Sequence, residues 1–363
     1  MNELTLYRKY RPQTFSDVVG QPHITHTLSR EIITGKIGHA YLFCGTRGTG
    51  KTSIAKIFSR AVNCENLHEN GDPCNECSSC RGLLNGTIMD VMEIDAASNN
   101  GVEHVRALRN EVIFAPSAVK YRVYIIDEVH MMTTSAFNAL LKTLEEPPAH
   151  AIFVLATTEA NKVPATIQSR CQRFDFRRIS SEDIAGNLLK IANLDGFTLA
   201  EDAAAQIGTL ADGAMRDALS LLEQCKSAGV DSGTIDLALV QQTLGISGAE
   251  KFFDLASAIA KNDIGAALVS ADEIMSKSGD SITFVNALLS HFRDLAVCKN
   301  LAEPAKIVDK PAEIVKKFQA QAEEFSNDKI VACMQKLAEI IYASKQTGAP
   351  KVLVESGIVM MCK

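Results

Sequence analysis

The sequence predicts an α/β protein with a parallel sheet, and three observations lead to this fold class. Short apolar segments alternate with helix-like segments up to about residue 178, as in consecutive βα units. Each strand candidate ends directly before polar residues, and a glycine-rich loop follows the first one. Because ligands of open parallel sheets lie outside the carboxyl ends of the strands, we expect a site at this edge. The strand candidates are Ala40–Cys44, Asp90–Asp95, Arg122–Asp127 and Ala151–Thr157.

The loop after the first strand, Gly45–Thr52, has the complete pattern GxxxxGK[ST]. Apolar residues recur at helical spacing from Thr52 to Ala61, so the loop is predicted to join a strand to a helix. Glycines let backbone N–H groups wrap a polyphosphate, Lys51 brings a positive charge to the outer phosphates, and the Thr52 hydroxyl is a ligand for Mg²⁺. The predicted phosphate contacts are Gly45, Thr46, Gly48, Thr49, Gly50, Lys51, Thr52 and Ser53.

Two adjacent acids, Asp127 and Glu128, end the third strand candidate. Asp127 is placed to hold the Mg²⁺ shell, and Glu128 is the candidate base that polarises a water attacking the γ-phosphate. Acids at a strand end often only cap the next helix. Because an intact phosphate loop lies upstream, we interpret both acids as catalytic, together with Lys51.

Other polar residues have candidate roles that the pattern alone leaves open. A hydroxyl of Thr157 or Thr158 could bond the γ-phosphate or the attacking water, although a threonine pair can simply end a strand. Arg170 could stabilise the transferring phosphoryl group, or it could be a surface arginine of a basic stretch. Arg216 could contact nucleotide from the second domain, or it could form an ordinary surface ion pair.

Four of the ten cysteines form a cluster in the sequence, Cys64, Cys74, Cys77 and Cys80. Two-residue spacings let neighbouring sulfurs reach one ion, and four thiolates complete a closed tetrahedral zinc site. A full ligand set with no open position indicates a structural metal. An iron–sulfur cluster uses the same ligands and is the alternative.

The chain is predicted to contain three domains, because the strand pattern ends at Ser180. Ser180–Asp183 has the composition of a helix start, and a second break falls at Gly245–Gly248. The predicted domains are residues 1–179 with the cysteine segment 64–80, residues 180–242, and residues 243–363. In the last domain we expect a helical bundle with helices at Lys251–Lys261, Gly265–Lys277, Ile282–Asn300 and Ile330–Lys345.

Composition narrows the classes of function. The chain has no tryptophan and 6% aromatic residues, which argues against stacked-aromatic binding of nucleic acid. With a net charge of −6, the chain as a whole lacks the excess of positive charge that attracts DNA. With no signal-peptide pattern, no apolar run of membrane-spanning length and no disulfide framework, we expect a cytoplasmic protein without membrane association.

Together these motifs make the chain resemble the gamma/tau family of bacterial DNA polymerase III, the AAA+ ATPases of the sliding-clamp loader. The resemblance is dense up to about residue 245, and the remaining helical layout is similar. The matching segments are Tyr7–Pro12 with Phe15 and Val18–Gln21, Gly45–Thr52, the four cysteines, Asp127–Met131, Phe137–Pro148, Leu155–Thr158, Ser169–Cys171 and Arg216–Ser220.

The resemblance implies an AAA+ P-loop domain with a zinc-binding insertion, a small helical lid domain and a helical collar domain for oligomerisation. It implies ATP, Mg²⁺ and Zn²⁺ as cofactors, and ATPase activity within the DNA polymerase III holoenzyme. Thr158, or its neighbour Thr157, would be the first sensor and Arg216 the second, while Arg170 would act in trans on nucleotide held by the adjacent subunit. Adenine and ribose would be enclosed by Tyr7, Arg8, Tyr10, Arg11, Pro12, Val18 and Val19.

The family also implies partners: the other subunits of a hetero-pentamer, the sliding clamp and primer–template DNA. Helicase and polymerase are expected only through a C-terminal extension that the family's longer form has beyond a position such as Lys363. DNA contact is expected at helix N-termini after Ser98–Gly101 and Thr133–Ser135, although the same residues could simply cap those helices.

Two other classes of function compete with clamp loading. One is an AAA+ motor with another task, such as a helicase or branch-migration motor, but no pore element for translocation is evident. The other is a scaffold subunit with an inactive site, which the presence of Lys51, Thr52, Asp127 and Glu128 argues against.

Overall fold

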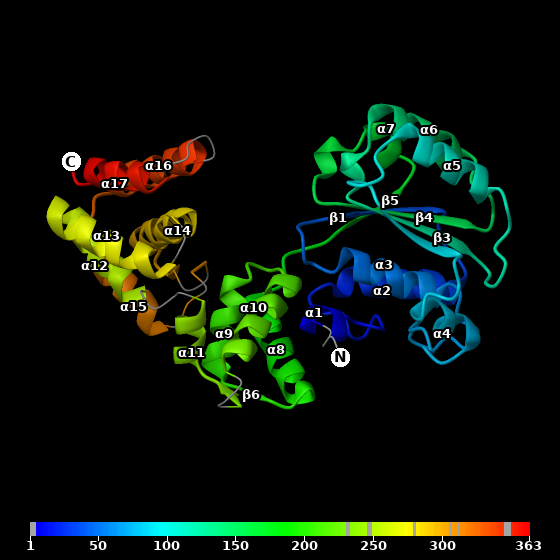
Figure 1. Cartoon of the computed structure of the whole chain (residues 1–363), viewed down its shortest axis with the longest axis horizontal. Coiled ribbons are helices and arrows are strands. Elements are labelled where there is room, and N and C mark those ends of the chain that lie inside the picture. The colour runs from blue at the N-terminus through cyan, green and yellow to red at the C-terminus, as the bar shows by residue number, and fades with distance from the viewer. Residues whose placement is uncertain are drawn as a thin grey trace. The chain divides into compact units, whose positions relative to one another are not determined.

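The computed structural model describes residues 5–229, 233–244, 249–278, 281–304, 307, 308, 310, 312–344 and 350–363 (Figure 1). The chain divides into two compact units, Met1–Glu223 and Gln224–Lys363, and the division falls within one helix, Met215–Ala228. The predicted domain boundaries at 179/180 and 242/243 stay predictions, and the predicted break at Gly245–Gly248 lies outside the described residues.

The first unit contains a five-stranded sheet in the order β2-β3-β4-β1-β5, with every neighbouring pair parallel. The four predicted strands are confirmed, with Val91 as the first residue of the second in place of Asp90. The fifth strand was missed, because it is an edge strand with only Phe174 buried. The strands are β1 Ala40–Cys44, β2 Val91–Asp95, β3 Arg122–Asp127, β4 Ala151–Thr157 and β5 Gln172–Asp175.

Helices cover both faces of this sheet, as Figure 1 shows: α2 (Pro22–Thr34) and α3 (Lys51–Ala61) on one, α5 (Val102–Val112) and α6 (Thr134–Glu145) on the other. Each face has its own apolar core, because alternate strand side chains point to opposite faces. The short helices of this part are α1 Leu6–Lys9, η1 Val129–Met131, α4 Ser78–Leu84, η2 Ala160–Lys162 and α7 Ala165–Gln168.

Helices dominate the chain after the sheet, as predicted. Ser180 caps α8 by accepting a hydrogen bond from the Asp183 amide at 3.1 Å, so the predicted helix start is confirmed. The next elements are α8 Ser181–Asp195, β6 Thr198–Leu199, α9 Glu201–Leu210 and α10 Met215–Ala228. The two-residue strands β6 and β7 (Thr234–Ile235) were not predicted.

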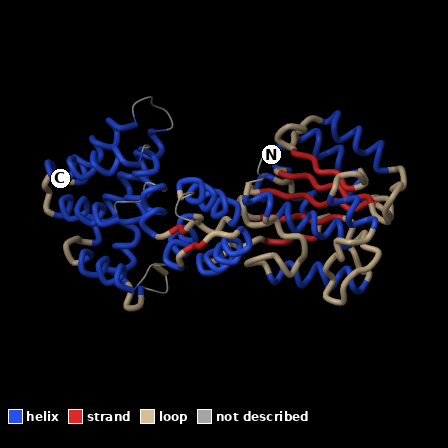
Figure 2. The backbone as a smooth tube through the Cα atoms, turned by 60° about the horizontal axis from the view of Figure 1, so that its bottom comes forward, coloured by secondary structure: helices blue, strands red, loops and turns tan. Residues whose placement is uncertain are grey.

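The second unit is a bundle of mostly long helices (Figure 2). The four predicted bundle helices are confirmed within a few residues, although the predicted end at Lys345 lies outside the described residues. Three helices, α11, α15 and α17, were not predicted individually. The helices are α11 Leu237–Thr243, α12 Ala249–Ala260, α13 Ile264–Ser278, α14 Ser281–Asn300, α15 Ala312–Ala322, α16 Asn327–Ser344 and α17 Pro350–Met361.

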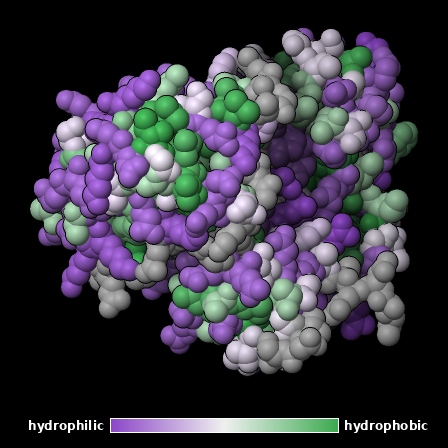
Figure 3. All heavy atoms as spheres, turned by 60° about the vertical axis from the view of Figure 1, so that its left-hand side comes forward, coloured by the Kyte–Doolittle hydropathy of each residue, from purple (hydrophilic) through white to green (hydrophobic). Residues whose placement is uncertain are grey.

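Helix α14 is the centre of this bundle, since it packs against α13, α15, α16 and α17. Its buried residues include Phe284, Leu288, Phe292 and Leu295, which recur every three or four positions along one face. The face turned forward in Figure 3 is largely hydrophilic, with apolar side chains in a few groups. Within the described part of the chain, no helix is both long enough and apolar enough to cross a membrane.

Candidate functional site

The phosphate loop lies at the carboxyl end of β1 and leads into α3, in the predicted strand–loop–helix context. Gly50, the N-cap of α3, has a φ of 102°, a conformation that side-chain-bearing residues rarely adopt. A Cβ at Gly45 would lie 2.7 Å from the Phe176 carbonyl oxygen, so this position also requires glycine. No side chain caps the first turn of α3, and its N–H groups are available to an anion.

Lys51 and Thr52 begin α3 beside the end of β3. The Lys51 ammonium donates to the carbonyl oxygens of Gly45 at 2.8 Å and Thr46 at 2.9 Å. Burial lowers the pKa of Lys51, and the carboxylates of Glu128 and Asp127 oppose that shift. The Thr52 hydroxyl donates to Asp127 Oδ2 at 2.7 Å, so two oxygens suited to Mg²⁺ are adjacent.

Glu128 has an unusual backbone for a non-glycine residue, with φ 48° and ψ 45°. Its amide donates to Asp127 Oδ1 at 2.9 Å, which helps to hold this left-handed conformation. Such conformations cost of order 1–3 kcal/mol and occur preferentially at functional sites. The turn directs the Glu128 side chain toward the end of β4.

The two threonines after β4 have different surroundings. Thr158 donates from its hydroxyl to Glu128 Oε2 at 3.0 Å and from its amide at 3.3 Å. Thr157 is fully buried, and its Oγ1 lies 3.0 Å from His130 Nδ1. Direct contact with Glu128 favours Thr158 as the residue that senses the γ-phosphate, and this role stays a prediction.

His130 was not predicted as a site residue, yet its side chain is only 7% exposed and lies among polar groups of the site. Its Nδ1 lies 3.3 Å from Glu128 Oε2, and its Nε2 lies 3.4 Å from Glu159 Oε1. The signal in the sequence was its position two residues after Glu128 in a predicted strand-end segment.

A cleft of about 1160 Å³ lies over the phosphate loop. It brings together sixteen of the predicted residues, whereas Gly45, Thr46, Thr158 and Arg170 are not among its lining residues. The predicted residues that line it are Tyr7, Arg8, Tyr10, Arg11, Pro12, Val18, Val19, Gly48, Thr49, Gly50, Lys51, Thr52, Ser53, Asp127, Glu128 and Arg216.

The helices after the sheet contribute a side of this cleft that was not predicted. Asn187, Lys190, Ile191 and Leu194 of α8 line it at i, i+3, i+4 and i+7, and Met215 and Leu219 of α10 join them. The helical periodicity of α8 shows one shared face, but the sequence does not say what that face meets.

Arg216 lies in the cleft against the N-terminal segment, with its guanidinium carbon 4.9 Å from the centre of the Tyr7 ring. This contact places Arg216 at the cleft, whereas the alternative of an ordinary surface ion pair is not tested by it. Arg170 lies outside the cleft of its own chain, where it donates to the Thr166 carbonyl at 2.8 Å and pairs with Glu145. Arg170 is not among the lining residues of the cleft, and its action in trans stays a prediction.

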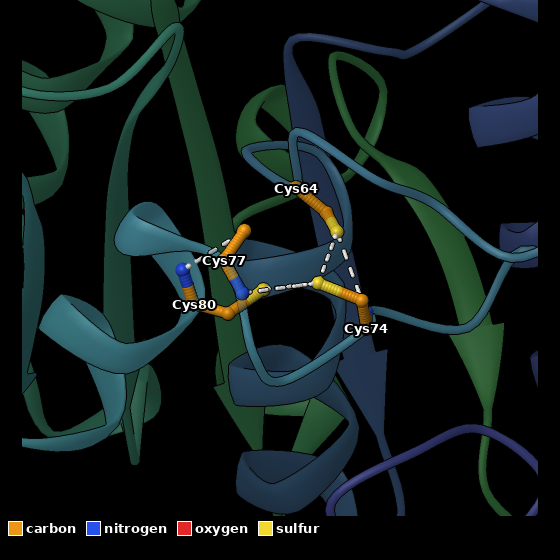
Figure 4. Close-up of side chains that lie close together, drawn as sticks. All are labelled: Cys64, Cys74, Cys77 and Cys80. Carbon is orange, nitrogen blue, oxygen red and sulfur yellow. Dashed lines mark hydrogen bonds between the residues drawn. The ribbon is translucent and has the colours of Figure 1, made fainter.

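The four predicted cysteines converge, and all their sulfurs lie within 4.8 Å of one another (Figure 4). Sulfurs of a tetrahedral zinc site with Zn–S of ~2.3 Å lie about 3.8 Å apart, so the arrangement fits zinc. Backbone amides of Cys74, Cys77 and Cys80 donate to cluster sulfurs at 3.3–3.4 Å.

The thiols of the cluster differ in their pKa values. Burial raises the pKa of Cys74, but amides of Glu76 and Cys77 outweigh it and lower the value to about 6. Burial and the neighbouring sulfurs of Cys77 and Cys64 raise the pKa of Cys80. Zinc binds thiolates, so a bound zinc ion would hold these cysteines deprotonated.

The two helix N-termini predicted to contact DNA lie close together, since the Thr133 amide donates to the Asn100 carbonyl at 3.1 Å. Thr133 caps α6 by accepting from the Ala136 amide at 3.2 Å, so the capping interpretation holds there. Gly101, the N-cap of α5, offers no side-chain cap.

The parallel sheet, the phosphate loop and the acids at the end of β3 define an AAA+ fold. A solved structure titled as the Holliday junction branch migration motor RuvB of Thermotoga maritima matches with a TM-score of 0.51 and 18% identity. The match covers 74% of this chain and 85% of that one. At this identity the likeness concerns the fold alone.

Comparison with protein families identifies the chain more closely. Residues 20–180 match the model of "DNA polymerase III, delta subunit", residues 183–230 that of "DNA polymerase III clamp loader subunit, ATPase lid domain", and residues 235–362 that of "DNA polymerase III subunits gamma and tau domain III". The predicted lid domain and helical C-terminal region are thereby confirmed as parts of the fold.

Relatives with curated names are subunits of the same kind as those named by the family models. DNA polymerase III subunit tau of Bacillus subtilis is 45% identical over all of this chain and 64% of its own length. Subunit gamma of Buchnera aphidicola is 42% identical, over 72% of each chain, and subunit gamma/tau of Mycobacterium tuberculosis is 36% identical over 97% of this chain and 61% of its own. The chain belongs to the family of DNA polymerase III subunits gamma and tau. It spans 64% and 61% of the Bacillus and Mycobacterium relatives.

Proposed function

We propose that this chain is the ATPase motor subunit of a bacterial clamp loader. ATP binding and hydrolysis would open the sliding clamp and load it onto primer–template DNA during replication. The observation that carries the proposal is the convergence of Lys51, Thr52, Asp127 and Glu128 in one cleft of a gamma/tau family member. All four are retained, which argues against an inactive scaffold subunit.

Some residues of the cleft would bind the nucleotide, and others would catalyse its hydrolysis. The loop amides and Lys51 would hold the phosphates, and Tyr7–Pro12 with Val18 and Val19 would enclose adenine and ribose. Glu128 would accept the proton of the attacking water, and Thr158, already bonded to Glu128, would orient it toward the γ-phosphate.

Two metals would have separate parts. Thr52 and Asp127 would hold Mg²⁺, which neutralises charge on the phosphates. Cys64, Cys74, Cys77 and Cys80 would hold zinc with no open position, and this site would be structural.

Arg170 would complete the active site of the adjacent subunit, and Arg216 would report nucleotide to the helices after the sheet. Partners would be the other subunits of a hetero-pentamer, the clamp and DNA. Exposed apolar residues of the second unit, including Val269, Val331, Tyr342, Val352 and Met360, would contribute to the oligomerising collar.

Phosphate release from MgATP by the reconstituted assembly tests the proposal. We expect the rate to rise when clamp and primed DNA are both added, and to stay at background with Lys51→Ala subunits. An unchanged rate with clamp and primed DNA would contradict clamp loading, although hydrolysis itself would still identify an ATPase.

A mixing experiment tests the shared active site. Lys51→Ala and Arg170→Ala subunits, each inactive in a uniform assembly, should regain hydrolysis when mixed, because some interfaces then combine an intact loop with an intact arginine. Arg173→Ala is the control, since Arg173 lies in the same basic stretch and pairs with Asp175 at 2.7 Å. No recovery on mixing would show that Arg170 does not act in trans.

A further inference from the structure

The cysteine module, residues 64–80, makes direct contact with the N-terminal segment that lines the nucleotide cleft. Two stretches of that segment line the cleft, residues 7–13 and residues 17–19. Phe15 and Ser16 lie between the two stretches, and both are bonded to one carboxylate of the module, that of Asp72.

Asp72 is only 5% exposed, and its two carboxylate oxygens accept hydrogen bonds from different groups of the N-terminal segment. Oδ1 accepts from the Phe15 amide at 2.6 Å, and Oδ2 accepts from the Ser16 hydroxyl at 2.6 Å. Asn70 of the same loop donates to Asp72 Oδ2 at 2.8 Å, which fixes the carboxylate from the module side. Hydrogen bonds to a carboxylate are stronger than those between neutral groups, so Asp72 holds Phe15 and Ser16 strongly.

A second junction ties the same segment to the helix that follows the phosphate loop. Arg60 of α3 is 6% exposed and donates to the Gln13 carbonyl at 2.8 Å. Its Nε donates to Asn75 Oδ1 of the module at 3.2 Å, and Asn75 in turn donates to the Gln13 carbonyl at 3.3 Å. Gln13 is itself a residue of the cleft.

The module also packs closely against α2. Gly71 has a φ of 86°, and a Cβ there would lie 2.8 Å from the Ser29 Cβ of α2. Beyond the junctions, the segment reaches the helices on the other side of the cleft. Tyr10 donates to Asp195 of α8 at 2.7 Å, and Tyr7 lies under the Arg216 guanidinium.

We propose that the cysteine module is a positioning element of the nucleotide site, which sets affinity by holding the segment from Tyr7 to Val19 through Asp72 and Arg60. The module itself does not line the cleft, so Asp72 is a positioning residue that acts through Phe15 and Ser16. This inference rests on the proposed binding of nucleotide in the cleft.

A graded set of variants tests it. Asp72→Ala removes both acceptors, Asp72→Asn keeps an acceptor for the Phe15 amide, and Ser16→Ala removes one exposed partner. We expect the dissociation constant of a fluorescent ATP analogue to rise about tenfold, about fivefold and about threefold in that order, since one net hydrogen bond is worth roughly a factor of two to ten. Glu69→Gln, an exposed acid three residues before Asp72, is the matched control and should bind as the wild type does.

Two further readouts separate positioning from general loss of structure. The hydrolysis rate at saturating ATP and the zinc content should stay within twofold of the wild type in every variant. Amide hydrogen exchange should increase in residues 7–19 of Asp72→Asn but not in α3 or α5. A purely structural role would instead increase exchange across the unit and lower the bound fraction without changing the dissociation constant.

The outcomes are distinguishable. If the wild type does not bind the analogue, the proposed function fails. If the wild type binds it and Asp72→Asn and Ser16→Ala bind equally well, the positioning role is wrong, even if Asp72→Ala does not fold.

Discussion

Two histidines with similar burial show how the two units of the molecule differ. His130 lies at the carboxyl edge of the sheet, within 3.4 Å of Glu128, Thr157 and Glu159. His291 lies in the helical unit between Phe253 and Phe318, with ring centres 4.8 and 4.7 Å away. Both are buried polar side chains, but the first has a carboxylate neighbour, Glu128, that also lines the cleft.

His291 has a hydrogen-bond partner inside the bundle. Its Nε2 lies 2.8 Å from Gln321 Oε1, and the Gln321 amide donates to the Phe253 carbonyl at 2.6 Å and the Ser257 hydroxyl at 2.9 Å. At the sheet edge, by contrast, Glu128 has a strained backbone and faces the cleft. Strain and access to a cleft, rather than burial of polar groups, distinguish a site from a core.

The largest effect that tests this difference is loss of the candidate base. Glu128→Gln should lower the hydrolysis rate roughly 100- to 1000-fold, because general-base catalysis contributes about that much. ATP binding should stay within about threefold, since Lys51 and the loop remain. His291→Phe is the comparison and should leave the rate unchanged; an equal loss in both variants would remove the distinction between site and core.

A smaller effect concerns the helical unit at low pH. Burial lowers the pKa of His291 to about 4, with Lys310 acting in the same direction and Gln321 and Asp294 opposing it. The unfolded histidine titrates near ~6.5, so between these values the unfolded state binds more protons. The contribution of His291 to the free energy of unfolding is therefore greatest above about pH 7. It falls by about 2 kcal/mol between pH 7 and pH 5.

Amide exchange of α14, corrected for intrinsic rates, measures that change. His291→Phe fills the aromatic cluster without a titrating group, so its stability should depend less on pH by the same amount. Equal pH dependence in both proteins would show that His291 is not the titrating group.

The smallest effect distinguishes the two threonines. Thr158→Val removes the hydroxyl that bonds Glu128 and should lower hydrolysis about tenfold, as for loss of one hydrogen bond to a charged group. Thr157→Val removes the partner of His130 and should have a smaller effect. The ratio of the two hydrolysis rates at saturating ATP shows which threonine is the sensor. A larger loss in Thr157→Val would identify Thr157 as the sensor and contradict the assignment of Thr158.

Local patterns predicted much of this fold and site. Three strands have the predicted ends because their side chains are almost all buried and apolar runs define them. The cysteine spacing predicted the cluster, since two-residue spacings constrain where the sulfurs can point. β5 was missed because an edge strand with one buried side chain carries no such run.

Other parts depend on contacts that are distant in sequence. Nothing near Asn187 or Leu194 says that α8 lines the cleft, and nothing near Asp72 says that its carboxylate binds Phe15. The likeness to a known family supplied the roles of Arg170, Arg216 and the segment from Tyr7, which residue patterns alone left open.

Equilibrium binding of MgATP tests the central claim most directly, namely that the cleft over Gly45–Thr52 is the nucleotide site. Wild type, Lys51→Ala and Glu128→Gln are titrated with the same fluorescent analogue. The account predicts saturable binding by the wild type and Glu128→Gln. It predicts at least roughly 100-fold weaker binding by Lys51→Ala, because the phosphates lose the charge of the Lys51 ammonium. Wild-type affinity in Lys51→Ala would contradict it.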